Sequence, residues 1–134
     1  MSQNRGKDFE GVIYNAFSKL DGCSIDRVLD QTNGFKGSWN ICDFIIYRFP
    51  TQLFLECKTT NQNTLPLTNI TDNQFVGLLE KSFLLGVRAG VIIWFVNSDK
   101  TVYIPIQEVY RWCLSGKKSI NVKDLDYLVH VAIN

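Results

Sequence analysis

Hydrophobic side chains recur every three or four positions between residues 6 and 20, which is the period of an α-helix. The stripe that they predict consists of Phe9, Val12, Ile13, Ala16, Phe17 and Leu20. Glu10 falls about 90° from the centre of this stripe at about 100° per residue, so we expect it at the flank of the buried face. The pair Asp21-Gly22 ends the predicted helix.

After residue 22 the pattern changes to short apolar runs between polar turns, which is typical of β-strands. Strands are predicted at 24–29, 42–47 and 53–58. A loop rich in turn-forming residues is expected at 30–40, between the first two strands. Pro50 marks the turn between the second and third strands.

The second half of the chain again alternates helix and strand. The polar stretch 59–70 predicts an irregular segment, and Thr71 then opens a helix, because Thr71 and Gln74 have the spacing of a capping box. The apolar positions of this helix run to Phe83, and Gly86 is its predicted end. The remaining predicted elements are a strand at 90–96 that is apolar on both faces, a strand at 102–106, a short helix at 107–114 and an ambiguous segment from Ser119. This order predicts an α/β or α+β fold, in which helices flank a mixed central β-sheet.

The composition narrows the class of protein. A chain of 134 residues predicts one domain, residues 1–134, and its 46% hydrophobic and 20% charged residues are ordinary for a globular protein. No apolar run approaches the roughly 18 residues of a membrane span, and the polar first ten residues predict no secretory signal. The four cysteines form no CxxC pair, so we expect reduced thiols, a cytoplasmic location and no membrane partner.

Charge and histidine content narrow the chemistry further. The net charge is +1, so a nucleic-acid-binding surface would need positive charge that is local rather than general. His130 is the single histidine, which argues against a His-rich zinc site and a His-based triad. A metal site in this chain would therefore use oxygen ligands.

Two charged residues interrupt the apolar strand in the stretch LFLECKTT. Because alternate residues of a strand share a face, Phe54, Glu56 and Lys58 point to the same side. An even-length turn between the two central strands would pair Ile45 with Phe54. It would then place Asp43 opposite Glu56, whereas an odd-length turn would break this pairing. Like charges directly opposed across a sheet are destabilising, and a bound divalent cation would keep both carboxylates ionised.

These residue types suit metal-assisted hydrolysis of a phosphodiester. Carboxylate oxygens are the ligands that Mg²⁺ prefers, and Mg²⁺ usually takes its remaining ligands from water and substrate phosphate. Such an ion activates water and stabilises charge on a phosphoryl group. Lys58, on the same face, would hold the attacking water or neutralise the developing charge, and Glu10 would add a further carboxylate.

Each of these residues also has a structural interpretation. A Glu-x-Lys at the end of a strand is often a solvated or ion-paired couple. For Gln74 we favour the role of helix cap over a chemical role. Trp94 and Trp112 are typical core or edge aromatics, whereas Trp39, in the loop before Asp43, is a candidate for stacking on nucleic-acid bases.

Four blocks of the sequence carry a family resemblance. They are NRGKDFE (4–10), SWNICDF (38–44), LECKTTNQNTLPLTNITDNQ (55–74) and KKSINVKDL (117–125). In this order they resemble the RecU-type Holliday-junction resolvases of the PD-(D/E)xK nuclease superfamily. The Glu-x-Lys motif alone is weak evidence for this family. When TT…T-x-P-L-x-N-I…Q follows it, the motif is specific. The resemblance implies a restriction-endonuclease-like core and a homodimer that nicks two strands of a four-way DNA junction, using Mg²⁺ or Mn²⁺.

The resemblance also implies roles for single residues. Asp43 and Glu56 match the family's metal-binding acids, and Lys58 matches its catalytic lysine. Glu10 matches the acid on the first helix, and the backbone carbonyl of Cys57 would be a further metal ligand.

Further positions would support the site or contact DNA. Gln74 matches a glutamine near the family's active site, and the polar stretch after the lysine helps to shape that site. The supporting and DNA-contacting candidates are Gln74, Thr59, Thr60, Thr64, Arg5, Lys7, Lys36 and Trp39, with Lys117 and Lys118 less certainly placed.

Two departures from the family pattern bear on the substrate. Asn73 stands where the family usually has histidine. Family members carry a long projection that enters the junction, and here only the loop 30–40, with Phe35, Lys36 and Trp39, fills its place. The family's basic N-terminal extension is also missing, and the short form suggests a phage-encoded or minimal relative. Cleavage chemistry is therefore better supported than junction selectivity.

Three hypotheses about function follow. The first is a divalent-metal-dependent endonuclease that resolves Holliday junctions in recombination and repair. The second is a less selective nuclease of the same superfamily, of the restriction or repair type. The third is a non-catalytic DNA-binding protein of the same fold, against which the intact set Asp43, Glu56 and Lys58 argues.

Overall fold

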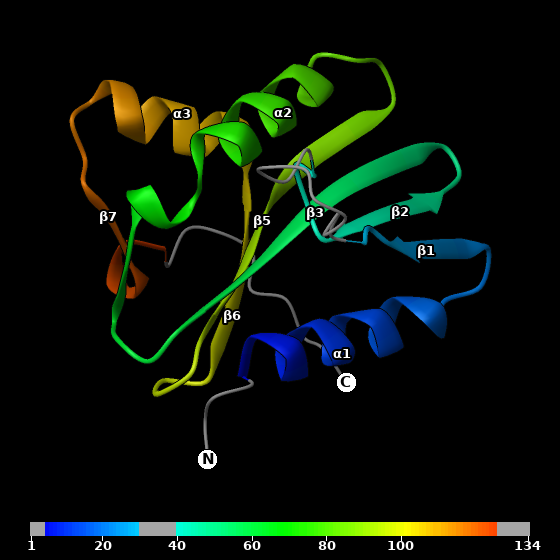
Figure 1. The fold of residues 1–134 in the computed structure, drawn as a ribbon, viewed down its shortest axis with the longest axis horizontal. Coiled ribbons are helices and arrows are strands. Elements are labelled where there is room, and N and C mark those ends of the chain that lie inside the picture. Colours follow the sequence, from blue (N-terminus) through cyan, green and yellow to red (C-terminus); the bar gives the residue numbers. More distant parts are fainter. Residues whose placement is uncertain (1–4, 30–39, 126–134) are drawn as a thin grey trace, which may run out of the picture.

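The computed structural model describes residues 5–29 and 40–125 (Figure 1). The elements, in chain order, are α1 (Arg5–Ser18), β1 (Cys23–Arg27), β2 (Phe44–Arg48), β3 (Thr51–Thr60), β4 (Thr64–Pro66), the 3₁₀ turn η1 (Leu67–Asn69), α2 (Asp72–Ser82), β5 (Val87–Phe95), β6 (Lys100–Pro105), α3 (Ile106–Leu114), β7 (Ser119–Asn121) and the 3₁₀ turn η2 (Val122–Leu125). Strands and helices thus alternate as the hydrophobic pattern predicts.

A five-stranded sheet with the order β1-β2-β3-β5-β6 forms the centre of the fold. The pair β3–β5 is parallel and the other pairs are antiparallel, so the sheet is mixed. The connection between the two parallel strands contains α2, as parallel pairing requires a crossover. The predicted mixed sheet flanked by helices is confirmed.

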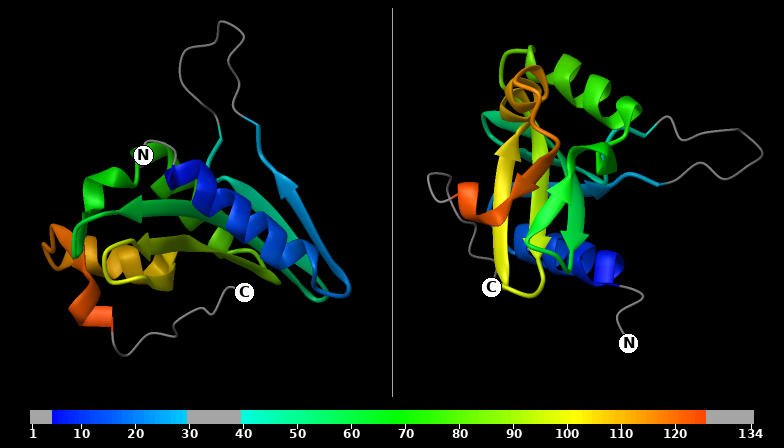
Figure 2. Two further views of the ribbon diagram at one scale, coloured as in Figure 1. Left: turned by 90° about the horizontal axis from the view of Figure 1, so that it is seen from below. Right: turned by 90° about the vertical axis from the view of Figure 1, so that its left-hand side faces the viewer.

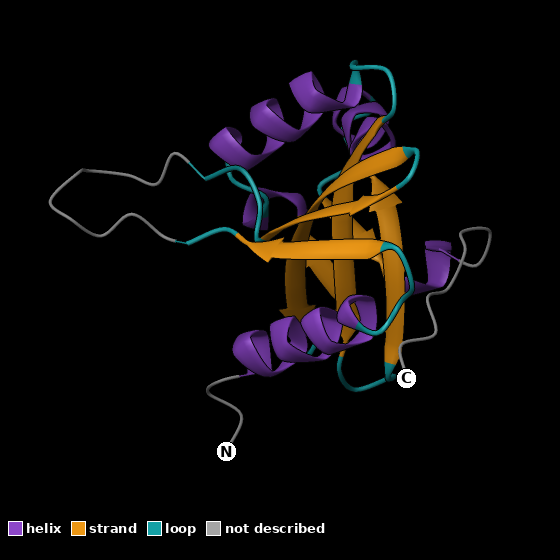
Figure 3. Ribbon diagram, turned by 90° about the vertical axis from the view of Figure 1, so that its right-hand side faces the viewer, coloured by secondary structure: helices purple, strands orange, loops and turns teal. Residues whose placement is uncertain are grey.

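Helices cover both faces of this sheet (Figures 1 and 3). On one face α1 packs through Phe9 and Ile13 against alternate residues of β2 and β3, such as Phe44 and Leu55. On the other face α2 and α3 bury Leu78 and other apolar side chains against β5 and β6. Figure 2 shows this layered arrangement from two further directions. Each face of β3 therefore lies under a different helix.

The predicted register of the central hairpin is confirmed. Ile45 pairs with Phe54 and Tyr47 pairs with Gln52. The turn between β2 and β3 is thus of even length. The two strands place their alternating side chains on matching faces, which is the condition for bringing Asp43 near Glu56.

The segment 59–70 differs from the prediction of an irregular stretch. β3 continues to Thr60, and β4 then pairs antiparallel with β7 in a separate two-stranded sheet. Leu65 and Ile120 are buried in this small sheet. The pairing joins segments that are far apart in the sequence, so periodicity within 59–70 could not reveal it. The ambiguous segment from Ser119 supplies the partner strand.

The ends of the predicted helices also differ. α2 stops at Ser82, and Phe83, expected on its apolar face, is 74% exposed. Gly86 lies after the helix in the turn before β5, with a φ of 78° that suits glycine. The buried stripe of α1 is narrower than predicted, because Val12 and Leu20 are exposed. No helix among the described residues is long and apolar enough to cross a membrane.

Packing of α2 on the sheet should carry a large part of the stability. Leu78 has no exposed surface, so Leu78→Ala should lower the free energy of unfolding by about 2–5 kcal/mol. Val76, on the same helix, is 51% exposed. Val76→Ala should therefore change the free energy of unfolding by about 0.5 kcal/mol or less. Urea denaturation measures the free energy of unfolding of both variants. Equal losses in the two would contradict the orientation of α2.

Candidate active site

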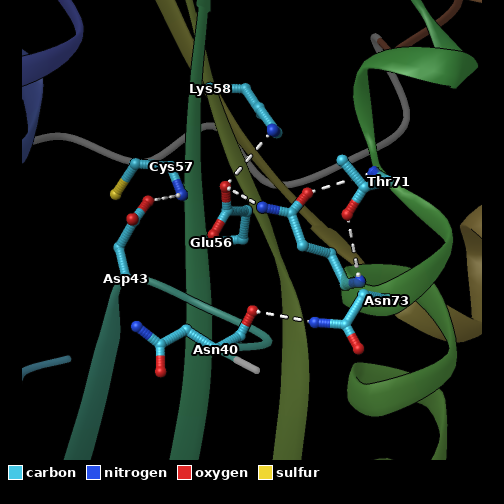
Figure 4. Close-up of polar contacts among 8 residues, drawn as sticks. Asn40, Asp43, Glu56, Cys57, Lys58, Thr71 and Asn73 are labelled. Atoms are coloured by element: carbon cyan, nitrogen blue, oxygen red, sulfur yellow. Dashed lines mark hydrogen bonds and ion pairs between the residues drawn. The ribbon is translucent and has the colours of Figure 1, made fainter. Parts of the chain in front are cut away.

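Asp43 is fixed at the point where β2 begins. Its backbone N–H donates to Leu55 O at 3.0 Å, and its carbonyl accepts from Val28 N at 2.8 Å. The β2–β3 ladder stops at Phe44 and Leu55, so the amide of Cys57 has no strand partner from β2. Asp43 Oδ2 accepts a hydrogen bond from this amide at 2.9 Å, which directs its carboxylate to β3 (Figure 4).

Glu56 is the one charged residue among those described that is buried, with 4% of its surface exposed. Leu55 and Cys57 point toward α1, so Glu56, between them, projects toward α2. Its Oε2 lies 3.2 Å from Lys58 Nζ and accepts a hydrogen bond from Gln74 Nε2 at 2.9 Å. The predicted shared face of Glu56 and Lys58 is confirmed by this ion pair.

The pKa of Glu56 reports how unfavourable its charge is in this position. Burial raises this pKa to about 8, and the negative charge of Asp43 and a hydrogen bond between the two side chains raise it too, while Lys58 opposes the shift. The two carboxylates are therefore in contact, as the hairpin register predicts. Without a further positive charge, the pair holds a proton near neutral pH.

The thiols beside the carboxylates are kept protonated. Burial, followed by the charge of Glu56, raises the pKa of Cys42 to about 12. Burial, followed by the charge of Asp43, also raises the pKa of Cys57 far above its ordinary value. Because the thiolate is the reactive form and the metal ligand, the two sulfur atoms are poor candidates for either role.

The donor atoms at this site fit a hard divalent cation such as Mg²⁺ or Mn²⁺. Asp43 and Glu56 offer oxygen atoms side by side, and a cation would relieve the repulsion that raises the pKa of Glu56. The backbone N–H and C=O groups of Leu55 and Cys57 point toward β2. The carbonyl of Cys57 therefore lies on the edge of β3 that faces Asp43. Among the described residues, no three His, Cys, Asp or Glu side chains converge as metal ligands. Mg²⁺ usually takes further ligands from water and substrate phosphate.

Gln74 combines the two roles that the sequence leaves as alternatives. Its backbone N–H donates to Thr71 Oγ1 at 3.2 Å and its Oε1 accepts from Thr71 N at 3.1 Å, which completes the predicted capping box. Its Nε2 is still available to donate to Glu56. One amide side chain thus joins the N-terminus of α2 to the buried carboxylate.

Glu10 belongs to α1, which covers the face of β3 opposite to that of α2. Its Oε1 forms an ion pair with Arg27 Nη1 at 3.2 Å, and its charge contributes to the raised pKa of Cys57, whose side chain faces α1. Glu10 is therefore on the α1 side of β3, whereas Glu56 projects to the α2 side. A role of Glu10 as metal ligand stays a prediction.

The other predicted residues lie on several parts of the chain. Thr59 and Thr60 end β3, and Thr60 Oγ1 donates to Thr64 O at 3.2 Å, which fixes the turn into β4. Arg5 and Lys7 lie in the first turn of α1. Lys36 and Trp39 lie outside the described residues, as does His130.

Two asparagines next to the site were not singled out from the sequence as site residues. Asn73 Nδ2 donates to the backbone carbonyl of Asn40 at 3.2 Å (Figure 4). Asn40 Nδ2 in turn donates to the carbonyl of Leu29. The position of Asn73, between the helix cap and Gln74, was the available signal. For Asn40 the sequence carries no such signal, because a polar residue at the end of a turn-rich segment is ordinary.

The raised pKa of Glu56 predicts how the stability of the metal-free protein depends on pH. The folded state binds the proton more tightly than the unfolded state, in which the pKa is near 4.5. The free energy of unfolding should therefore fall as pH rises from about 5 to about 8, by up to about 1.4 kcal/mol per pH unit from this group. Urea denaturation at a series of pH values, in the presence of a chelator, measures this dependence. Glu56→Gln should lose this part of the slope, and an unchanged slope would contradict the assignment.

The two roles of Gln74 can be separated by a matched pair of variants. Thr71→Ala and Gln74→Ala both break the capping box, so each should lower the free energy of unfolding by about 1 kcal/mol. Gln74→Ala alone removes a donor to the charged form of Glu56, so it should raise the Glu56 pKa further. Carbon-13 NMR of the Glu56 carboxyl during a pH titration measures this, and equal values in both variants would leave Gln74 as a cap only.

Comparison with known proteins places this arrangement in a family. Hjc, a Holliday junction resolvase from the archaeal hyperthermophile Archaeoglobus fulgidus, has a similar structure, with a TM-score of 0.62, 18% sequence identity, and coverage of 95% of this chain and 94% of that chain. At this identity the likeness concerns the fold alone. No curated protein matches the chain in sequence. The family model for recombination protein U (RecU) matches residues 27–133, well over half of the chain, and the protein therefore belongs to the RecU family.

Proposed function

We propose that this protein is a divalent-metal-dependent, structure-selective endonuclease that resolves four-way DNA junctions by phosphodiester hydrolysis in recombination and repair. The observation that carries the proposal is the buried Glu56 carboxylate, in contact with Asp43 and paired with Lys58. Membership of the RecU family and a fold like that of a Holliday junction resolvase support it. Its place of action would be the cytoplasm of a bacterial or phage-infected cell.

The residues at the site have distinct roles in the proposed reaction. Asp43, Glu56 and the carbonyl of Cys57 would hold Mg²⁺, for which Mn²⁺ could substitute. When bound, the ion would lower the pKa of a water molecule and offset charge on the phosphate. Asp43 is oriented by the Cys57 amide and Glu56 by the Gln74 amide, so neither carboxylate needs to reorganise. Glu10 is a candidate for a further carboxylate from the α1 side.

Lys58 would act on the attacking water or on the scissile phosphate. Its ammonium group lies 3.2 Å from Glu56 Oε2 and is mostly buried, so it is held in place beside the carboxylates. It would orient the water by hydrogen bonding and neutralise the charge that develops on the phosphoryl oxygens.

Binding of the junction would involve a homodimer and local positive charge. A four-way junction has approximate two-fold symmetry, so a C2 dimer would present two sites to two strands of like polarity. The net charge of +1 gives no general attraction to DNA, so phosphate contacts would come from single positions. The proposed basic positions are Arg5, Lys7 and Lys36. Trp39 would stack on bases, and Thr59, Thr60 and Thr64 would shape the site after the lysine.

Incubation with a synthetic four-way junction and a linear duplex, with and without Mg²⁺, tests the function. We expect paired symmetric nicks in the junction only and only with the metal. Similar cleavage of both substrates would favour the less selective nuclease, in keeping with the short loop 30–40. Binding without cleavage at any Mg²⁺ or Mn²⁺ concentration would favour a non-catalytic DNA-binding protein.

Substitutions test the assigned roles. Glu56→Gln and Lys58→Ala should each lower kcat for junction cleavage at least about 100-fold, because each removes a charge that acts on the reacting groups. Lys19→Ala, which removes an exposed lysine after α1, is the control and should retain activity. Circular dichroism of each variant verifies folding. Activity retained in Glu56→Gln or Lys58→Ala would refute its role.

A further inference from the structure

Helix α2 contacts the segment 40–42, which leads directly into Asp43. The side-chain amide of Asn73 donates to the backbone carbonyl of Asn40 at 3.2 Å. One turn later, Gly77 lies against the side chain of Ile41. Residues four apart share a face of a helix, so Asn73 and Gly77 present one continuous surface to this segment.

Gly77 is in the interior of α2, where glycine is less favourable than alanine. Its lack of a side chain permits a close approach. A Cβ at position 77 would lie 2.1 Å from Cγ2 and 2.7 Å from Cβ of Ile41. The Cβ atom is bound to the main chain, so a rotamer change cannot remove the overlap. An alanine at position 77 would therefore push the backbone of segment 40–42 away from the helix.

Helix α2 also contacts the second carboxylate, that of Glu56. Gln74, next to Asn73, donates to Glu56 Oε2 at 2.9 Å. The first turns of α2 thus contact both acids, Glu56 directly and Asp43 through the three residues that precede it. The hydrogen bond from Asn73 and the close packing at Gly77 are separate contacts, and both act on the same segment.

We propose that Asn73 and Gly77 are positioning residues that seat segment 40–42 on α2 and thereby set the distance between the Asp43 and Glu56 carboxylates. The proposal deepens the proposed function, because this distance decides how well the two acids share a cation. Asn73 and Gly77 themselves would contact neither metal nor DNA. Their effect would pass through the position of Asp43 alone.

The hydrogen bond from the Cys57 amide to Asp43 Oδ2 reports that position directly in the metal-free protein. The test measures hydrogen exchange of this amide by NMR, together with Mn²⁺ affinity from the EPR signal of free Mn²⁺. The variants are Gly77→Ala and Asn73→Ala, and Asp43→Ala defines the complete loss of the bond. Gly11→Ala is the matched control, since a Cβ there meets nothing within 4 Å.

We expect exchange of the Cys57 amide to accelerate about tenfold or more in Gly77→Ala, with a loss of Mn²⁺ affinity of about 10-fold to 100-fold. Asn73→Ala should act in the same direction and less strongly. Gly11→Ala should leave both quantities at the wild-type value. In junction cleavage, Gly77→Ala should lower kcat with little change in KM for DNA.

Adding Ile41→Ala to Gly77→Ala should recover part of the protection of the Cys57 amide, because it removes the nearest overlapping atom. Wild-type protection of this amide in both Gly77→Ala and Asn73→Ala would overturn the inference. Should Gly77→Ala fail to fold, Asn73→Ala decides, since it removes the hydrogen bond to Asn40 without adding atoms to the contact with segment 40–42. Wild-type protein that neither binds Mn²⁺ nor cuts DNA would refute the proposed function, while amide exchange would still decide the positioning.

Discussion

A carboxylate that is removed from water and placed beside a second carboxylate is costly to keep ionised, and Glu56 is in this position. The surrounding contacts reduce that cost: the ammonium group of Lys58 and the amide of Gln74 both reach the same oxygen. Asp43 meanwhile completes the hydrogen bonding of β3, where the ladder with β2 ends. The site therefore concentrates negative charge that its own residues neutralise only in part. This imbalance is the physical basis of the proposed metal site.

Helix α2 links stability and chemistry in this fold. Its capping box is a common device for starting a helix, yet Gln74 also orients the buried carboxylate. Its interior glycine lowers helix propensity but admits Ile41. A sequence optimised only for the helix would carry another residue at position 77, so the helix departs from the most stable sequence where it touches the site.

Much of the fold and part of the site were predictable from the sequence. Alternation along β3 placed Glu56 with Lys58, and an even-length turn gave the register that brings Asp43 near them. Both are local rules of strand geometry. The pairing of β4 with β7 and the contact of Asn73 with Asn40 join distant segments, and no local pattern encodes them. The exposure of Phe83 was missed because periodicity continues past the residue where the helix ends.

The small β4–β7 sheet has a consequence for the order of assembly. Its first strand follows the proposed catalytic lysine closely, and its second comes more than fifty residues later, near the end of the described chain. Leu65 and Ile120, which pair across the two strands, are both buried. During synthesis, β4 therefore has no pairing partner until β7 has left the ribosome. The chain after the proposed catalytic lysine thus completes its strand pairing only when all five strands of the central sheet have been synthesised.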